Sequence, residues 1–84
     1  YPNPFNPSTT ISFELPATAP VRLSVVDLQG RRVATLASGE LPAGRHDLRW
    51  TGRDDRGRHA PAGVYMFRLE TGGEVRTGKL VMLK

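Results

Sequence analysis

The stretch that decides the fold is VRLSVVDLQ at residues 21–29, the longest segment of the chain without glycine or proline. An average α-helix needs about 11–12 residues and tolerates neither residue well in its interior. Apolar and polar side chains alternate within the stretch, at Val21, Arg22, Leu23, Ser24 and Val25. This is the period of a β-strand, with the valines and the leucine facing a core and Ser24 facing outward. A helical bundle is therefore excluded.

Similar short strands are predicted on both sides of this one, separated by turn residues. They cover residues 9–14, 31–36, 45–51, 64–70 and 74–83. Turns or loops are expected at residues 15–20, 27–30, 38–40, 41–44, 52–63 and 72–73, where glycine, proline and aspartate gather. Many short strands with this punctuation predict an all-β fold, an immunoglobulin-like β-sandwich of about six to seven antiparallel strands.

The length of 84 residues permits one small domain with a thin core. Residues 1–8 form a proline-rich leading segment, and the sandwich is expected at residues 9–84. Because the chain begins with Tyr1, we interpret it as a domain of a longer protein. The absence of cysteine excludes disulfides, cysteine-bound metal and thiol catalysis. The apolar run at residues 80–83 is far shorter than the ~20 residues of a membrane span.

The titratable residues do not form an arrangement that is typical of an enzyme. His46 shares a predicted strand face with Leu48 and Trp50, which favours a packed position, and His59 lies in a polar loop. The adjacent Asp54 and Asp55 would point apart in extended backbone, unlike a general acid and base pair. The sequence therefore predicts a protein without catalytic activity and without a cofactor.

Three binding functions remain as alternatives to a purely structural role. Asp54 and Asp55 with loop carbonyls could hold Ca²⁺, although neighbouring arginines already supply counter-charge and favour an ion-paired turn. Five arginines between residues 45 and 58 could contact nucleic acid, yet three aspartates interrupt them and no aromatic ladder accompanies them. A solvated, ion-paired face is preferred. Trp50, Tyr65 and Phe67 could bind a sugar, but a domain this small needs them in its core.

The order of motifs along nearly the whole chain resembles the C-terminal sorting domains of bacterial type IX secretion. The matching segments are YPNPFNPSTTI at residues 1–11, VDLQGRRV at 26–33, LPAG at 41–44, WTGRD at 50–54, AGVY at 62–65 and KLVMLK at 79–84. The same segments also resemble the immunoglobulin-like domain of the flagellar hook-capping protein, FlgD.

The resemblance to sorting domains implies a function, a route and partners. Such a domain directs an upstream cargo domain of the same chain from the periplasm across the outer membrane, so the protein is expected to be secreted or on the cell surface. The implied partners are the type IX export machinery and a sortase-like protease. Neither nucleic acid nor a membrane span is expected. The alternative is a passive or adhesive immunoglobulin-like module that packs on its neighbour or binds polysaccharide.

The resemblance also assigns residues to two groups. The recognition group is Gly63, Tyr65, Lys79, Leu80, Val81, Met82, Leu83 and Lys84. The second group matches family motifs and is expected to be structural: Pro2, Asn3, Pro4, Asp27, Gly30, Trp50, Gly52 and Asp54. A structural role is also expected for Tyr65, as a core residue whose hydroxyl bonds the backbone in a tyrosine corner.

Overall fold

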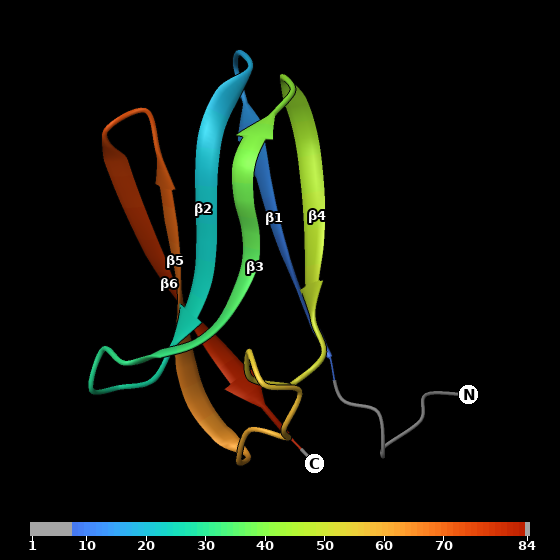
Figure 1. Ribbon diagram of the computed structural model, residues 1–84, viewed down its shortest axis with the longest axis vertical. Helices are drawn as coiled ribbons and strands as arrows, with labels where there is room; N and C mark the ends of the chain where they lie inside the picture. The colour runs from blue at the N-terminus through green and yellow to red at the C-terminus, as the bar shows by residue number, and fades with distance from the viewer. Residues whose placement is uncertain (1–7, 84) are drawn as a thin grey trace.

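The computed structural model describes residues 8–83, which form six antiparallel strands in two sheets. Strand β1 (Thr9–Leu15) pairs with β4 (Gly44–Trp50) in a two-stranded sheet. The other sheet has the order β3-β2-β5-β6. Its strands are β2 (Ala19–Val26), β3 (Arg32–Leu41), β5 (Gly63–Thr71) and β6 (Glu74–Met82). The predicted all-β sandwich is confirmed, and Figure 1 shows β1 and β4 side by side, to the right of β2.

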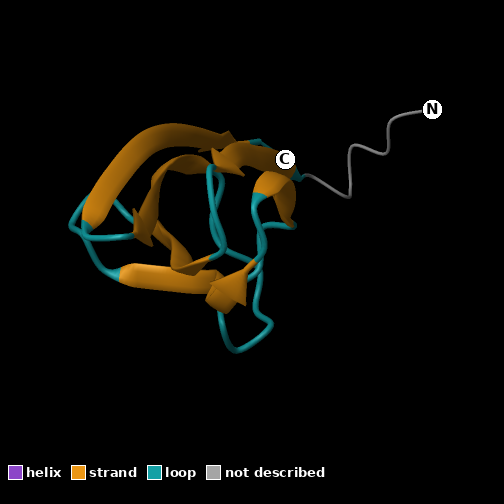
Figure 2. Cartoon of the chain, turned by 90° about the horizontal axis from the view of Figure 1, so that it is seen from above, coloured by secondary structure: helices purple, strands orange, loops and turns teal. Residues whose placement is uncertain are grey.

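The core lies between the two sheets, and Figure 2 shows the strands curving around it. The most completely enclosed large side chains are Leu23, Val25 and Trp50. The other buried apolar residues are Ile11, Leu15, Val21, Ala34, Ala60, Tyr65, Leu69, Leu80 and Met82. The inward alternation predicted for β2 is therefore confirmed, and both sheets contribute to a single hydrophobic cluster.

Two local predictions are wrong. Ser24 is buried rather than exposed because β2 is a central strand, with Thr35 of β3 and Arg68 of β5 directly opposite it. Residues 38–40 do not break β3, which pairs with β2 up to Leu41. The long antiparallel pairing supplies backbone hydrogen bonds along this segment, and it overrides the local preference of Gly39 for a turn.

The β5–β6 hairpin turns through Gly72 and Gly73, whose φ angles are 56° and 82°. Two positive φ angles define a type I′ turn, which closes on a hydrogen-bonded pair, here Thr71 and Glu74. Hydrogen-bonded and non-hydrogen-bonded pairs then alternate along an antiparallel ladder. It follows that the backbone N–H and C=O groups that point away from β5 belong to Val75, Thr77, Lys79 and Val81.

The structure shows which residues of the last strand face the core, which the sequence pattern did not decide. Leu80 and Met82 are buried in the core, whereas Val81 and Leu83 are exposed on the outer face. β6 lies at the end of the four-stranded sheet and, within residues 8–83, pairs only with β5. Among residues 8–83, β6 therefore presents a free strand edge whose outward side chains include Lys79 and Val81.

Candidate functional site

The turn after β2 is held by one carboxylate. Asp27 Oδ1 accepts hydrogen bonds from the backbone N–H groups of Gln29 and Arg31, each at 2.9 Å. Its Oδ2 pairs with Arg31 Nε, also at 2.9 Å. The Gly30 N–H donates to the Asp27 carbonyl at 2.9 Å, and its φ of 84° requires glycine or a strained residue. The predicted tight turn is confirmed, with Asp27 bonded to the local backbone and Gly30 at positive φ.

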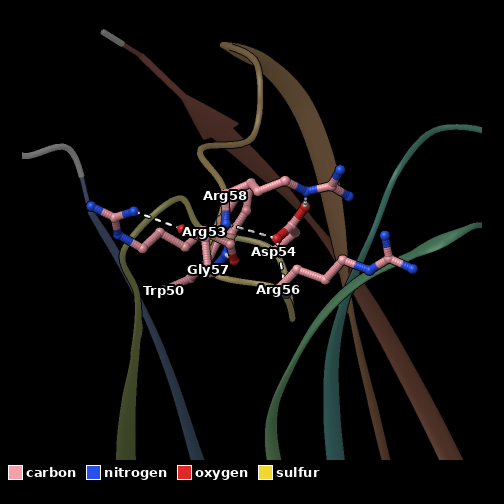
Figure 3. A network of polar contacts seen from close by, with 6 residues as sticks. All are labelled: Trp50, Arg53, Asp54, Arg56, Gly57 and Arg58. Atoms are coloured by element: carbon pink, nitrogen blue, oxygen red, sulfur yellow. Dashed lines mark hydrogen bonds and ion pairs between the residues drawn. The ribbon is translucent and has the colours of Figure 1, made fainter.

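The loop between β4 and β5 repeats this turn in the same pattern, Asp-x-x-Gly-Arg. Asp54 Oδ1 accepts from the backbone N–H groups of Arg56 and Arg58, each at 2.9 Å. Its Oδ2 pairs with Arg58 Nε at 3.0 Å, and the Gly57 N–H donates to the Asp54 carbonyl at 2.9 Å. Figure 3 shows this network. The ion-paired turn that the sequence favours here is confirmed, and the spacing that it shares with the turn after β2 is visible in the sequence.

Asp55 connects the loop to β3. Its backbone N–H donates to the Val33 carbonyl at 3.0 Å, and its Oδ1 accepts from the Thr35 N–H at 2.8 Å. Its Oδ2 lies 3.5 Å from Arg32 Nε. Asp54 and Asp55 therefore hold different backbone segments instead of converging. Across residues 8–83, no three or more His, Cys, Asp or Glu side chains are placed to hold a metal ion.

Two aromatic residues join the loop to the core. The Trp50 and Tyr65 rings meet edge to face with centroids 5.0 Å apart. Trp50 Nε1 donates to the Arg53 carbonyl at 2.9 Å, and the Tyr65 hydroxyl donates to the Pro61 carbonyl. The tyrosine corner is confirmed, and burial raises the pKa of the Tyr65 phenol. These rings are in the core and do not form a sugar-binding platform.

Gly52 combines a backbone conformation that favours glycine with close packing on Met82. Its φ is 80°, and a Cβ there would lie 3.3 Å from the sulfur and the terminal carbon of Met82. The start of the loop is therefore packed directly on the closing strand, which agrees with the structural role expected for Gly52.

Acidification is expected to open both Asp-x-x-Gly-Arg turns. Hydrogen bonds from the backbone N–H groups of Arg31 and Arg58 lower the pKa values of Asp27 and Asp54 below the usual 3.8. A lowered folded-state pKa gives stability that is present above the unfolded pKa and is lost as the pH falls through the folded value. The free energy of unfolding should therefore hold from pH 7 to about 5 and fall below about pH 4.

Urea unfolding at pH 7, 5, 4 and 3 tests this expectation. The double variant Asp27→Asn/Asp54→Asn should be less stable at pH 7 and should lose less stability on acidification. Glu40→Gln, on the exposed end of β3, is the matched removal of a carboxylate outside the turns. If the free energy of unfolding of the double variant fell on acidification as much as that of the parent, Asp27 and Asp54 would not be the source of the acid sensitivity.

The arginines predicted as one cluster are divided in space. Arg45 and Arg49 lie on β4, where Arg45 Nε pairs with Asp47 at 3.2 Å. Arg53 turns the other way and donates to the Gly57 carbonyl at 2.7 Å (Figure 3). The remaining two, Arg56 and Arg58, line one groove of about 970 Å³ together with Arg31 of the β2–β3 turn and Arg32 at the start of β3. We call it the arginine groove. Sequence analysis missed Arg31 and Arg32 because they are distant along the chain.

The two histidines have no catalytic neighbours among the described residues. The His46 ring stacks on Phe13 with centroids 5.4 Å apart, and its Nε2 lies 2.8 Å from the Pro42 carbonyl oxygen. His59 is exposed and forms an isolated bridge with Arg53. In the part of the chain that the structure describes, no helix has the length and hydropathy of a membrane span.

The recognition residues fall into three sets. Leu80, Met82 and Tyr65 are core residues. Gly63, Lys79, Val81 and Leu83 are exposed along β5 and β6. Lys84 and the motif residues Pro2, Asn3 and Pro4 lie outside the described residues. The structure thus separates the members of the last strand that serve folding from those that are available to a partner.

Comparison with known proteins places the fold in context. The family model described as "FlgD Ig-like domain" matches residues 3–74. A crystal structure of FlgD from P. aeruginosa is 26% identical, with a TM-score of 0.68, over 89% of this chain and 61% of that chain. Neither of these names is that of an enzyme. The chain therefore spans about three fifths of that FlgD chain.

A second solved structure has a looser similarity. It is the alkylpurine DNA glycosylase AlkC of Pseudomonas fluorescens bound to DNA with an abasic-site analog, at 22% identity and a TM-score of 0.42. The alignment covers 92% of this chain and 24% of that chain, and a similarity this loose carries no conclusion. No curated protein matches the chain.

Proposed function

We propose that this small non-catalytic module, which belongs to the FlgD Ig-like domain family, directs an upstream cargo across the outer membrane by type IX secretion. The type IX export machinery and a sortase-like protease are its proposed partners, and the cell surface or medium its destination. The ordered motifs that resemble type IX sorting domains support this proposal. The matched family by itself does not imply type IX export.

The free edge of β6 is the observation that carries the proposal. Within the described residues, β6 pairs on one side only, and Val75, Thr77, Lys79 and Val81 direct backbone N–H and C=O groups to the open side. An unpaired edge of this kind can take an added strand from a partner, with the main chain giving affinity and alternate side chains giving specificity.

The opposite edge of the same sheet is partly occupied. Asp55 donates a hydrogen bond to the carbonyl of Val33 and accepts one from the N–H of Thr35, so the loop covers this section of β3. The exposed side chains beside the β6 edge are a cation and two aliphatic groups, Lys79, Val81 and Leu83. We place recognition at this end of β6, where these groups and the free backbone lie together.

Deletion of the last strand cannot separate recognition from folding. A truncation that removes Gly78 to Lys84 also removes Leu80 and Met82, which are 6% and 3% exposed in the core. Loss of secretion after such a deletion would follow from unfolding alone. The informative changes are those that alter the edge and leave the inward side chains in place.

Proline at position 81 is expected to abolish export without unfolding the domain. The Val81 N–H points away from β5, so Val81→Pro removes a donor from the free edge and none from the β5–β6 ladder. The assay fuses residues 1–84 behind a signal peptide and a fluorescent protein, in a bacterium with working type IX secretion. Extracellular fluorescence should fall about tenfold or more, while the purified domain keeps its melting temperature within about 5 °C.

Val75→Pro is the matched control, because its N–H also points to the free edge but lies near the hairpin turn. This variant should be secreted as the parent is. Equal secretion of folded parent, Val81→Pro and Lys79→Ala fusions would contradict the strand-edge proposal. Retention of the folded parent fusion in the periplasm would overturn the sorting function and favour the passive or adhesive module.

A further inference from the structure

The outward side chains of β6 have the same pattern when they are followed from either end. They are apolar, polar, polar and apolar in turn, at Val75, Thr77, Lys79 and Val81. The two valines are 53% and 49% exposed, and Gly78 lies at the centre of the series. The same four residues direct their backbone N–H and C=O groups away from β5. A two-fold axis pairs residues at equal distances from it, so this edge is self-complementary.

A two-fold axis at Gly78 gives a regular antiparallel pairing between two copies of β6. Thr77 then lies opposite Lys79 of the second copy, and Val75 lies opposite Val81 of the second copy. Both are pairs of residues whose backbone groups point to the open side, so each pair can exchange two hydrogen bonds. Gly78 faces its own copy, and no side chain of either glycine separates the two strands there.

The same pairing extends an apolar row across the contact. Val64 of β5 is 41% exposed and lies directly opposite Val81 in the β5–β6 ladder. Val75 of the second copy would lie on the other side of Val81, so three valines would be side by side on one face of the sheet. The two-fold axis repeats the row at the other end of the contact. Apolar side chains that are exposed in the single domain therefore gain partners, and such cross-strand pairs stabilise a sheet.

Lys79 disfavours the neighbouring registers. Outward backbone groups recur at every second residue, so the nearest alternative axes lie at Thr77 and at Lys79. An axis at Lys79 would place the two lysines directly opposite each other, and like charges in that position destabilise a pairing. An axis at Thr77 would place Val75 against Lys79 of the second copy and Val81 beside the β5–β6 turn. Among these registers, only the axis at Gly78 brings the valines together.

We propose that a second copy of this domain binds the free edge of β6, antiparallel to it and about a two-fold axis at Gly78. The two four-stranded sheets become one continuous sheet in this dimer. The proposal requires only residues of β5 and β6 and does not depend on the sorting function. Because the dimer covers the same edge, its dissociation would expose the strand to an export partner. The contact is a single pair of strands, so we expect a reversible dimer that dissociates on dilution.

Sedimentation equilibrium of the 84-residue chain over a range of concentrations measures the association. Val75→Lys/Val81→Glu places opposite charges across both valine pairs and should keep the affinity within about threefold of the parent value. Val75→Glu/Val81→Glu places like charges there and should weaken association about tenfold or more. This second variant also lowers the positive net charge of the chain, so general repulsion between domains would not explain its loss. Leu28→Glu changes an aliphatic side chain that is 66% exposed outside the contact, and should leave the affinity unchanged.

Val75→Pro keeps the test decisive if the charged variants lose their fold. It removes a donor to the second copy and none from the β5–β6 ladder, so association should weaken about tenfold or more while the melting temperature stays within about 5 °C. A parent chain that stays monomeric at every concentration, or weakening by Leu28→Glu equal to that of Val75→Glu/Val81→Glu, would overturn the dimer. Equal association of the two folded double variants would overturn the axis at Gly78. None of these outcomes bears on secretion of the fusion, so the dimer and the sorting function can fail separately.

Discussion

Replacement of Trp50 by alanine is expected to remove a large share of the free energy of unfolding of the domain. Trp50 is 1% exposed and is the only tryptophan of the chain. Removal of a buried aromatic side chain costs roughly 3–5 kcal/mol through lost burial and the cavity left behind. A domain of this size has a total stability of roughly 4–13 kcal/mol, so the variant loses a large share of it.

The phenylalanine variant separates packing from hydrogen bonding. Trp50→Phe keeps a ring against Tyr65 but removes the Nε1 donor to the Arg53 carbonyl. It should cost less than Trp50→Ala and should loosen the loop after β4. Urea unfolding measures the loss of stability in each of the two variants. It is followed by far-ultraviolet circular dichroism because both variants lack the tryptophan signal. An alanine variant within about 1 kcal/mol of the parent would show that this ring does not hold the two sheets together.

Gly78→Ala is expected to destabilise the domain, in contrast to the usual effect of this substitution in a strand. Gly78 is not among the glycines with positive φ, so alanine fits its backbone and would ordinarily stabilise by about 0.4–1 kcal/mol. A Cβ at Gly78, however, would lie 2.2 and 2.5 Å from ring atoms of Phe67 on β5. Displacement of this ring should cost roughly 1–3 kcal/mol.

A double-mutant cycle tests whether the ring is the cause. Phe67 and Gly78 are directly opposite each other in the β5–β6 ladder. With Phe67→Ala as background, the cost of Gly78→Ala should disappear, which gives a coupling of about 1 kcal/mol or more. Thermal unfolding of the four proteins measures this coupling. Additive effects would show that the close approach of Phe67 does not determine the need for glycine.

Local patterns in the sequence were sufficient for much of the fold. The alternation in residues 21–25 predicted the buried side of β2, and Asp27 with Gly30 predicted the turn that follows. The tyrosine corner was also predicted, as the structural role expected for Tyr65 in an immunoglobulin-like sandwich. These features depend on residues that are close together in the chain, where side-chain period and turn chemistry decide the outcome.

The features that escaped prediction depend on neighbours that are distant in the sequence. Ser24 is covered because β3 and β5 flank β2, and no pattern in residues 21–29 contains that information. The pairing of β3 with β2 likewise overrides Gly39. The arginine groove combines residues 31–32 with 56 and 58, which only the meeting of two turns brings together. The sorting function and its residues stay predictions until the fusion assay is made.

The pairing of the first strand with the fourth affects the folding kinetics of the domain. β2–β3 and β5–β6 are hairpins between consecutive strands, and such units form in about 1–10 μs. The other two pairings join strands that are distant in the sequence. β2 pairs with β5, and β1 pairs with β4, each across two intervening strands. Sandwiches with such non-local contacts fold in roughly milliseconds to seconds. We therefore expect the slow step to be the docking of the β5–β6 hairpin on the β2–β3 hairpin, because the core is complete only when Leu80 and Met82 of β6 are in place.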